Sequence, residues 1–149
     1  WGDHGWHLGE HAIWGKHALF EESLRSPLII SYPGIPQPGK PTHSIVETLD
    51  VFPTICELAG LKIPDSLDGQ SLMPILKNPK TKGHPAFSYK GNAQTIRTQT
   101  HRLIVHKNGE YELYDHRTPD AETKNIAESQ SALVTELSQT LSSRLNSNK

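Results

Sequence analysis

Residues 3–16 (DHGWHLGEHAIWGK) hold three histidines, two acidic residues, two tryptophans and a lysine within fourteen positions. Imidazole and carboxylate groups at this density are typical of a metal site. Two patterns overlap in the stretch. Residues 7–11 (HLGEH) fit the H-x-x-E-H pattern of a class of zinc peptidases. Asp3, His4 and Gly5, followed by Lys16, form the second pattern.

The zinc peptidase interpretation requires a helix, because the two histidines must share one face with the glutamate as base. Gly9 stands inside the motif, with Gly5 and Gly15 close by, and each glycine costs a helix about 1 kcal/mol. A third protein ligand is also needed, and no downstream acidic residue is obvious. The peptidase stays open as the less favoured alternative.

The second pattern predicts an oxygen-preferring divalent cation. Asp3 and His4 can ligate one ion where the backbone turns sharply, as at the carboxyl edge of a strand, and Gly5 permits such a turn. The loop of residues 9–15 would bring back Lys16, whose charge suits a tetrahedral oxyanion. Two ligands do not hold an ion alone, so this interpretation requires further residues from an N-terminal portion.

Composition limits the classes of partner. The chain has 149 residues, a formal net charge of −1 and 34% hydrophobic residues, which argues against nucleic acid and membrane partners. The longest apolar run is strand-sized. Cys56 is the single cysteine, so no internal disulfide can form. Because the densest functional signal begins at residue 3, we expect a C-terminal part of a longer polypeptide.

The first half of the chain predicts an α/β arrangement. We expect a loop with a short helix over residues 14–19, a buried strand over residues 26–32 (SPLIISY), a second strand over residues 44–49, and helices over residues 51–59 and 71–76. Asp50 is expected to cap the first of these two helices, and Gly60 to end it. Its core face would carry Phe52, Ile55, Cys56 and Ala59.

The second half predicts an antiparallel sheet covered by one helix. Strand-like runs occupy residues 86–89, 94–98, 102–106 and 111–114, and Asn108-Gly109 between the last two indicates a hairpin. From Ser131 onward, leucines at positions 133, 137, 141 and 145 indicate an amphipathic helix, followed by a tail expected to fray. We therefore expect an α/β part over residues 1–77 and a small α+β subdomain over residues 78–149.

Motifs in order along nearly the whole chain resemble the formylglycine-dependent sulfatases, and most closely their iduronate-2-sulfatase-like branch. They are residues 2–11 (GDHGWHLGEH), 14–16 (WGK), 20–30 (FEESLRSPLII), 33–34 (PG), 49–54 (LDVFPT), 58–60 (LAG), 67–72 (LDGQSL), 96–98 (IRT) and 112–115 (ELYD). The resemblance implies the C-terminal part of an alkaline-phosphatase-like α/β fold.

The resemblance also implies roles for single residues. Asp3 and His4 match a pair that helps to coordinate Ca²⁺, with Mg²⁺ as the alternative, and Lys16 matches the catalytic lysine that binds the sulfate oxygens. Trp6 and Arg97 match positions near the substrate pocket. Two further candidates for substrate contact are His7 and His11.

The nucleophile of this family is a hydrated formylglycine made from the cysteine of a C-x-P-S-R motif. Cys56 is followed by residues 57–60 (ELAG), so it does not match and is expected to be a small core residue. We expect an N-terminal sulfatase portion to supply the nucleophile, a sulfated carbohydrate or another sulfate ester as substrate, and a periplasmic, secreted or lysosomal location. The chain alone should be inactive. A degenerate, non-catalytic sulfatase module is the other alternative.

Overall fold

The computed structural model describes residues 1–146, and the side chains of residues 1–144. The chain divides into two compact units, residues 1–29 with residues 87 onward, and residues 30–86. This division differs from the one predicted at residues 77 and 78, because the N-terminal residues pack with the C-terminal sheet. Among the described residues, no helix is both long and apolar enough to cross a bilayer.

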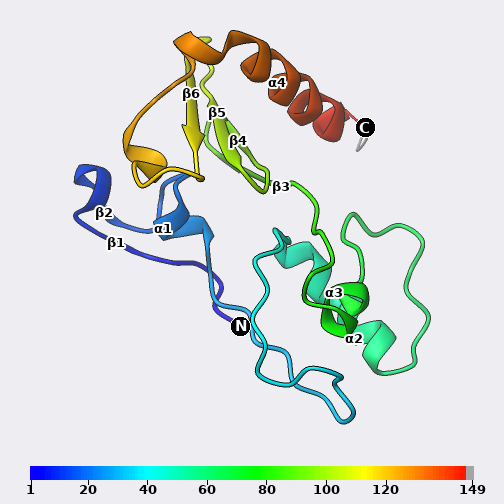
Figure 1. Ribbon diagram of the computed structural model, residues 1–149. Coiled ribbons are helices and arrows are strands. Elements are labelled where there is room, and N and C mark those ends of the chain that lie inside the picture. The colour runs from blue at the N-terminus through cyan, green and yellow to red at the C-terminus, as the bar shows by residue number, and fades with distance from the viewer. Residues whose placement is uncertain (147–149) are drawn as a thin grey trace. The chain divides into compact units, whose positions relative to one another are not determined.

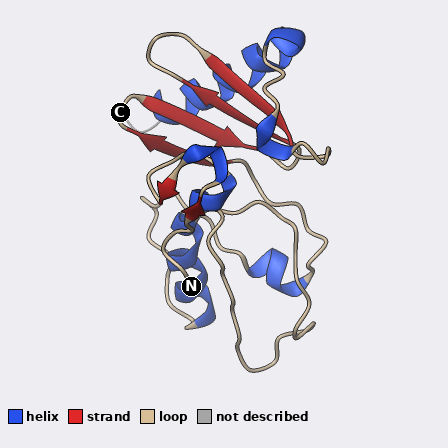
Figure 2. Cartoon of the chain, turned by 90° about the vertical axis from the view of Figure 1, so that its left-hand side faces the viewer, coloured by secondary structure: helices blue, strands red, loops and turns tan. Residues whose placement is uncertain are grey.

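A four-stranded antiparallel sheet forms the centre of the first unit (Figures 1 and 2). Its strands are β3 (Ala86–Lys90), β4 (Ala93–Arg97), β5 (His101–Val105) and β6 (Tyr111–Asp115), in sequence order. The predicted strands and the turn at Gly109, which has φ 87°, are confirmed. Alternation and turn chemistry suffice here because each strand pairs with the next one along the chain.

Helix α4 (Ser131–Asn146) covers one face of this sheet, as Figure 2 shows. Opposite one another in the register are Ile96, Leu103 and Leu113, each fully buried. They pack against buried α4 side chains, including Leu137 and Leu141. The predicted amphipathic helix is confirmed; the side chain at position 145 and the tail beyond position 146 lie outside the described residues.

The other face of the sheet is covered by the N-terminal segment. Ile104 and Tyr114 point to this face, where they form a second buried cluster with Leu19; Phe20 and Leu24 pack against it. Helix α1 (Glu21–Leu24) lies in this segment and is preceded by the antiparallel pair β1 (His7–Leu8) and β2 (Trp14–Gly15). The short helix predicted over residues 14–19 is therefore wrong, because Trp14 and Gly15 pair with β1 instead.

The second unit contains α2 (Val51–Leu58) and α3 (Met73–Lys77), close to the predicted helices. Gly60 has φ 67° and follows the end of α2 as expected. Asp50 does not cap α2 with its side chain. Its carboxylate instead accepts hydrogen bonds from the backbone N–H groups of Glu47 and Gln70. An imidazole nitrogen of His84 lies 2.7 Å from the same carboxylate, and the Asp50 side chain is fully buried.

Three expectations for the region of residues 26–59 are wrong. Residues 26–32 and 44–49 form no strand, and Ile29 is 86% exposed. On α2, Phe52 and Ile55 are more than half exposed, whereas Cys56 is buried as predicted. The common reason is that a strand needs a hydrogen-bonded neighbour and an apolar helix face needs a covering layer. The described residues provide neither at these positions.

Candidate active site

A short hairpin positions the candidate active-site residues. In the antiparallel pair, His7 lies opposite Gly15 and Leu8 opposite Trp14. Continuing this register places Lys16 opposite Trp6, and side chains alternate between the two faces of a strand. His4, Trp6 and Lys16 therefore share one face of the hairpin, and His7 belongs to the other. The hairpin register explains why a lysine twelve residues after His4 returns to it.

The side chains of Asp3, His4 and Lys16 converge, as the second sequence pattern predicted. The Lys16 Nζ atom lies 2.8 Å from Nε2 of His4. The same imidazole nitrogen lies 3.5 Å from Oδ2 of Asp3. On the other side of the ring, Nδ1 of His4 lies 2.8 Å from the carbonyl oxygen of Gly5. A proton on Nδ1 makes that bond and leaves a lone pair on Nε2 for the Lys16 ammonium group.

Asp3 and His4 present donors for a hard divalent cation. Asp3 presents a carboxylate that is 73% exposed, and His4 presents an imidazole lone pair on the same side. The imidazole of His4 already faces a positive charge, the ammonium group of Lys16. Carboxylate oxygen suits Ca²⁺ and Mg²⁺, and these ions take more ligands than two residues provide. The pair fits one part of such a site, as the resemblance implies.

Gly5 holds this segment against α1. Its backbone N–H donates a 2.8 Å hydrogen bond to the carbonyl of Ser23. A Cβ atom at Gly5 would lie 2.0 Å from the carbonyl oxygen of Glu22, far inside van der Waals contact. Gly5 does not have a positive φ. The backbone bends at Asp3, and Gly5 is required because only a glycine allows the close approach to α1.

Helix α1 is fixed to the sheet by ion pairs. Arg97 and Arg102 face each other across β4 and β5, and both bind Oε1 of Glu21, at 3.0 Å and 2.5 Å. Arg102 also pairs with the buried carboxylate of Glu122. Burial lowers the pKa of Arg97, although Glu21 opposes this effect. The Arg97 guanidinium group is thus held in an internal cluster, which favours a structural role for this side chain. Contact of Arg97 with substrate stays a prediction.

The remaining candidates behave differently from one another. Trp6 is 55% exposed, and its ring centroid lies 6.2 Å from that of His4, so it remains free to line a pocket. His7 is fully buried, which argues against the predicted substrate contact. His11 stacks on Phe20 with 3.9 Å between ring centroids, and its side chain is 16% exposed. A substrate role for Trp6 or His11 stays a prediction.

The zinc peptidase pattern does not form the helix that it needs. Residues 7–8 are a strand, and His11 and Ala12 have φ values of 54° and 56°. Glu10 is turned to the backbone, where its Oε2 accepts a 2.6 Å hydrogen bond from the N–H of Leu8. That hydrogen bond lowers the pKa of Glu10, which makes the carboxylate a weaker base. The sequence alternative of a peptidase is therefore wrong in its geometry.

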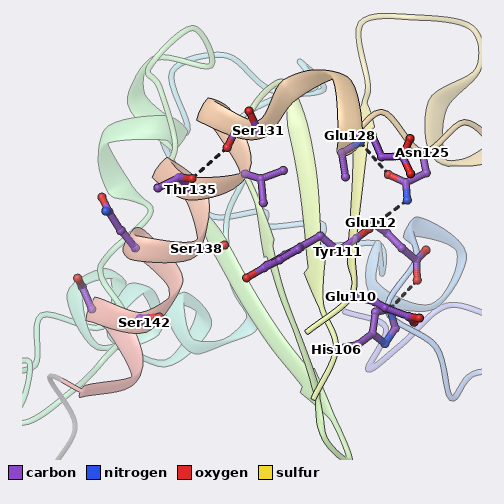
Figure 3. Close-up of a pocket in the computed structure, with 14 residues that line it drawn as sticks. His106, Glu110, Tyr111, Glu112, Asn125, Glu128, Ser131, Thr135, Ser138 and Ser142 are labelled. Carbon is purple, nitrogen blue, oxygen red and sulfur yellow. Dashed lines mark hydrogen bonds and ion pairs between the residues drawn. The ribbon is translucent and has the colours of Figure 1, made fainter. Parts of the chain in front are cut away.

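A separate hollow of about 960 Å³ lies between β6 and α4 (Figure 3). Its lining includes Tyr111, the serines and threonine of α4, and three glutamates at positions 110, 112 and 128. Among the residues whose side chains are described, no lysine or arginine lines it. An acidic hollow repels an anionic ester, so the loop at Asp3, His4 and Lys16 is the better candidate for sulfate.

Comparisons with known proteins identify the family of the chain. The family described as N-sulphoglucosamine sulphohydrolase, C-terminal, matches residues 9–149. An N-acetylglucosamine-6-O-sulfatase of Bacteroides thetaiotaomicron is 34% identical over 139 residues, covering 83% of this chain and 25% of the relative. A Δ4,5-hexuronate-2-O-sulfatase of the same organism is 34% identical over 140 residues, covering 84% and 29%.

A solved structure in complex with its substrate D-glucosamine-2-N,6-O-disulfate is 33% identical, with a TM-score of 0.82. It is matched over 95% of this chain and 32% of its own length. The chain thus spans about a quarter to a third of the relatives that it matches. The predicted fold class is confirmed: the C-terminal part of an alkaline-phosphatase-like fold, with a small antiparallel sheet and a terminal helix. This chain belongs to the sulfatase family and corresponds to the C-terminal region of its members.

Proposed function

We propose that this chain supplies the cation- and sulfate-binding side of a sulfatase that hydrolyses carbohydrate sulfate esters. The observation that carries the proposal is the convergence of Asp3, His4 and Lys16, with Lys16 Nζ 2.8 Å from His4 Nε2. The ammonium group can bind an anion, and the neighbouring carboxylate and imidazole lone pair can bind a cation. The carbohydrate substrates named for relatives support the class of ester.

Lys16 would bind the sulfate oxygens. The ammonium group has three N–H donors, and the bond to His4 uses one of them. That bond also uses the lone pair on His4 that a cation would need. Cation binding at His4 therefore requires Lys16 to turn to another acceptor, and a sulfate oxygen is a suitable one. Ca²⁺ or Mg²⁺, when bound, would add stabilisation of the charge that develops on the sulfuryl oxygens.

Several parts of the proposal concern residues outside this chain. The nucleophile would be a formylglycine in an N-terminal portion, which would also complete the cation site. The chain alone would be inactive. The exposed side chains of Trp1, Trp6 and Ile29 in the first unit offer apolar surface that such a portion could cover. An iduronate-2-sulfate-like ester is the narrower substrate that we propose, and a hexuronate-2-O-sulfatase among the relatives supports it.

The test uses the complete protein with Asp3→Ala and Lys16→Ala, and Lys107→Ala as an exposed control in the β5–β6 turn. We expect kcat/KM for sulfated disaccharides to fall about 10²-fold or more in the first two variants, as for loss of one electrostatic contact. The Lys107 variant should match the wild type. Near-normal turnover in the Asp3 or Lys16 variant would contradict the assignment. A folded wild-type protein that hydrolyses no sulfate ester would instead favour the degenerate, non-catalytic module.

A further inference from the structure

A second group of potential ligands lies on the buried face of the hairpin. Nε2 of His7 is 3.4 Å from Oε2 of Glu22, and Nε2 of His11 is 3.7 Å from the same oxygen. One ligand atom from each of the three residues can be chosen so that all lie within 4.8 Å of one another. His7 comes from β1, His11 from the turn after it, and Glu22 from α1. In Figure 1, β1, β2 and α1 lie in the same part of the ribbon.

Two atoms of this group are buried without a hydrogen-bond partner. They are Nε2 of His7 and Oε2 of Glu22, and the His7 side chain is fully buried. The other nitrogen of His7 is satisfied, because Nδ1 lies 3.0 Å from Oγ of Ser23 and 3.3 Å from the carbonyl oxygen of Gly15. A buried polar atom left unsatisfied costs about 1–3 kcal/mol. A proton on Nε2 or a metal ion between the two atoms would satisfy both of them.

The two separations between Glu22 Oε2 and the histidine nitrogens fit the edges of a tetrahedral metal site. Zinc bonds of about 2.0–2.1 Å to nitrogen and oxygen place neighbouring ligands of a tetrahedron about 3.3 Å apart. The two measured separations, 3.4 Å and 3.7 Å, are close to that edge. Two imidazoles and one carboxylate form a donor set that zinc accepts. The contact of His7 Nδ1 with the Gly15 carbonyl is the outer contact that usually orients a metal-bound imidazole.

A comparable group of ligand atoms elsewhere in the unit is neutralised by arginines, unlike the group at Glu22. Glu21, His116 and Glu122 also bring three potential ligand atoms together. There the two carboxylates are neutralised by the guanidinium groups of Arg97 and Arg102. No arginine or lysine forms an ion pair with Glu22 among those found in the described part of the chain. Glu22 therefore lacks the guanidinium charge that Glu122 has, and the groups that face it are two imidazoles, which can bind a metal ion.

We propose that His7, His11 and Glu22 bind a zinc ion, at a site separate from the cation site at Asp3 and His4. Three protein ligands leave a fourth position for water or for another group. The ion would join the hairpin to α1 and so fix the face that presents His4 and Lys16. Residues 7–11 contain two of the proposed ligands, and the third is Glu22 of α1, because the carboxylate of Glu10 accepts a hydrogen bond from the N–H of Leu8 instead.

The experiment measures zinc bound per protein by equilibrium dialysis of the complete protein after chelator treatment. We expect one zinc to bind at this site in the wild type. His11→Ala and Glu22→Gln should weaken that binding by more than about 10²-fold, beyond the loss caused by removing an outer contact. His17→Ala is the matched control, because His17 is an exposed histidine on the same segment. The His17 variant should bind zinc as the wild type does.

Asp3→Ala separates this site from the proposed catalytic cation. Zinc binding that survives Asp3→Ala and is lost in the His11 and Glu22 variants would support the proposal. Zinc binding that is lost in Asp3→Ala, or retained in both ligand variants, would overturn it. Absence of saturable zinc binding by the folded wild type would overturn it as well. If a ligand variant fails to fold, zinc-edge X-ray absorption of the wild type decides: two imidazole ligands are expected, and fewer would refute the site.

Discussion

Glu122 offers a sharp test of how α1 is held against the sheet. Its carboxylate is 4% exposed. One oxygen, Oε1, accepts a hydrogen bond from Nε of Arg102 and lies 3.0 Å from Nε2 of His116. The other accepts a 2.7 Å hydrogen bond from the backbone N–H of Glu21. Glu122→Gln keeps the shape of the side chain and removes its charge, so Arg102 loses its most buried counter-ion.

The expected cost follows from the pKa. Burial alone would raise the pKa of Glu122, but His116 and Arg102 outweigh it and lower the pKa from 4.5 to about 2. This difference between the unfolded and the folded pKa means that folding favours the ionised form of Glu122 over the neutral form by about 3 kcal/mol. Breaking a buried ion pair by removing one partner costs about 3–5 kcal/mol, which agrees. We therefore expect Glu122→Gln to lower the free energy of unfolding by about 3 kcal/mol at pH 7.

The pH dependence gives a second measurement of the same interaction. Because the folded pKa lies below the unfolded pKa, the Glu122 carboxylate contributes its full stability above about pH 5. The contribution is lost as the pH falls through the interval from 4.5 to about 2. Urea denaturation of the wild type and of Glu122→Gln at several pH values should therefore give a difference that shrinks across this interval.

Glu136→Gln is the control, because Glu136 is an exposed glutamate on α4. That variant should stay within about 0.5 kcal/mol of the wild type at every pH. The reasoning fails if Glu122→Gln is less than 1 kcal/mol below the wild type at pH 7. It also fails if the difference between the two proteins does not decrease at low pH.

Two further substitutions test packing. Gly5→Ala would place a Cβ atom 2.0 Å from the Glu22 carbonyl, so we expect a loss of about 1–3 kcal/mol or more in thermal unfolding together with reduced sulfatase turnover. Gly91→Ala, where φ is +56° and the space is open, should cost only about 1 kcal/mol and leave turnover unchanged. Leu113→Ala, at a fully buried position beneath α4, should cost about 2–5 kcal/mol in urea denaturation, whereas Leu8→Ala, 66% exposed, should cost less than about 0.5 kcal/mol. Equal losses in either pair would contradict the packing described.

Sequence reasoning succeeded where the structure depends on neighbours in the sequence. The four strands, the hairpin at Asn108-Gly109 and the helix from Ser131 were all predicted, because turns and periodic side chains determine them locally. It failed over residues 26–32 and on the α2 face with Phe52, where an apolar pattern lacks a partner among the described residues. A hydrophobic pattern predicts which side chains of a segment can be buried. Whether they are buried depends on the rest of the chain that packs against the segment.

In the loop of residues 3–16, some side-chain contacts could be predicted from the sequence and others could not. The approach of Lys16 to His4 could be predicted, since a hairpin of that length returns the chain to its start. The burial of His7 could not, because it depends on Ser23 and Glu22 of α1. The position of α1 depends in turn on arginines 76 and 81 residues later in the chain. The acidic pair at positions 21 and 22 was the available signal: one carboxylate binds those arginines, and the other faces two histidines with no comparable cation. Glu21 is neutralised by arginines and Glu22 is not. This difference between the two neighbouring glutamates is the physical reason to expect a metal ion at Glu22 rather than at Glu21.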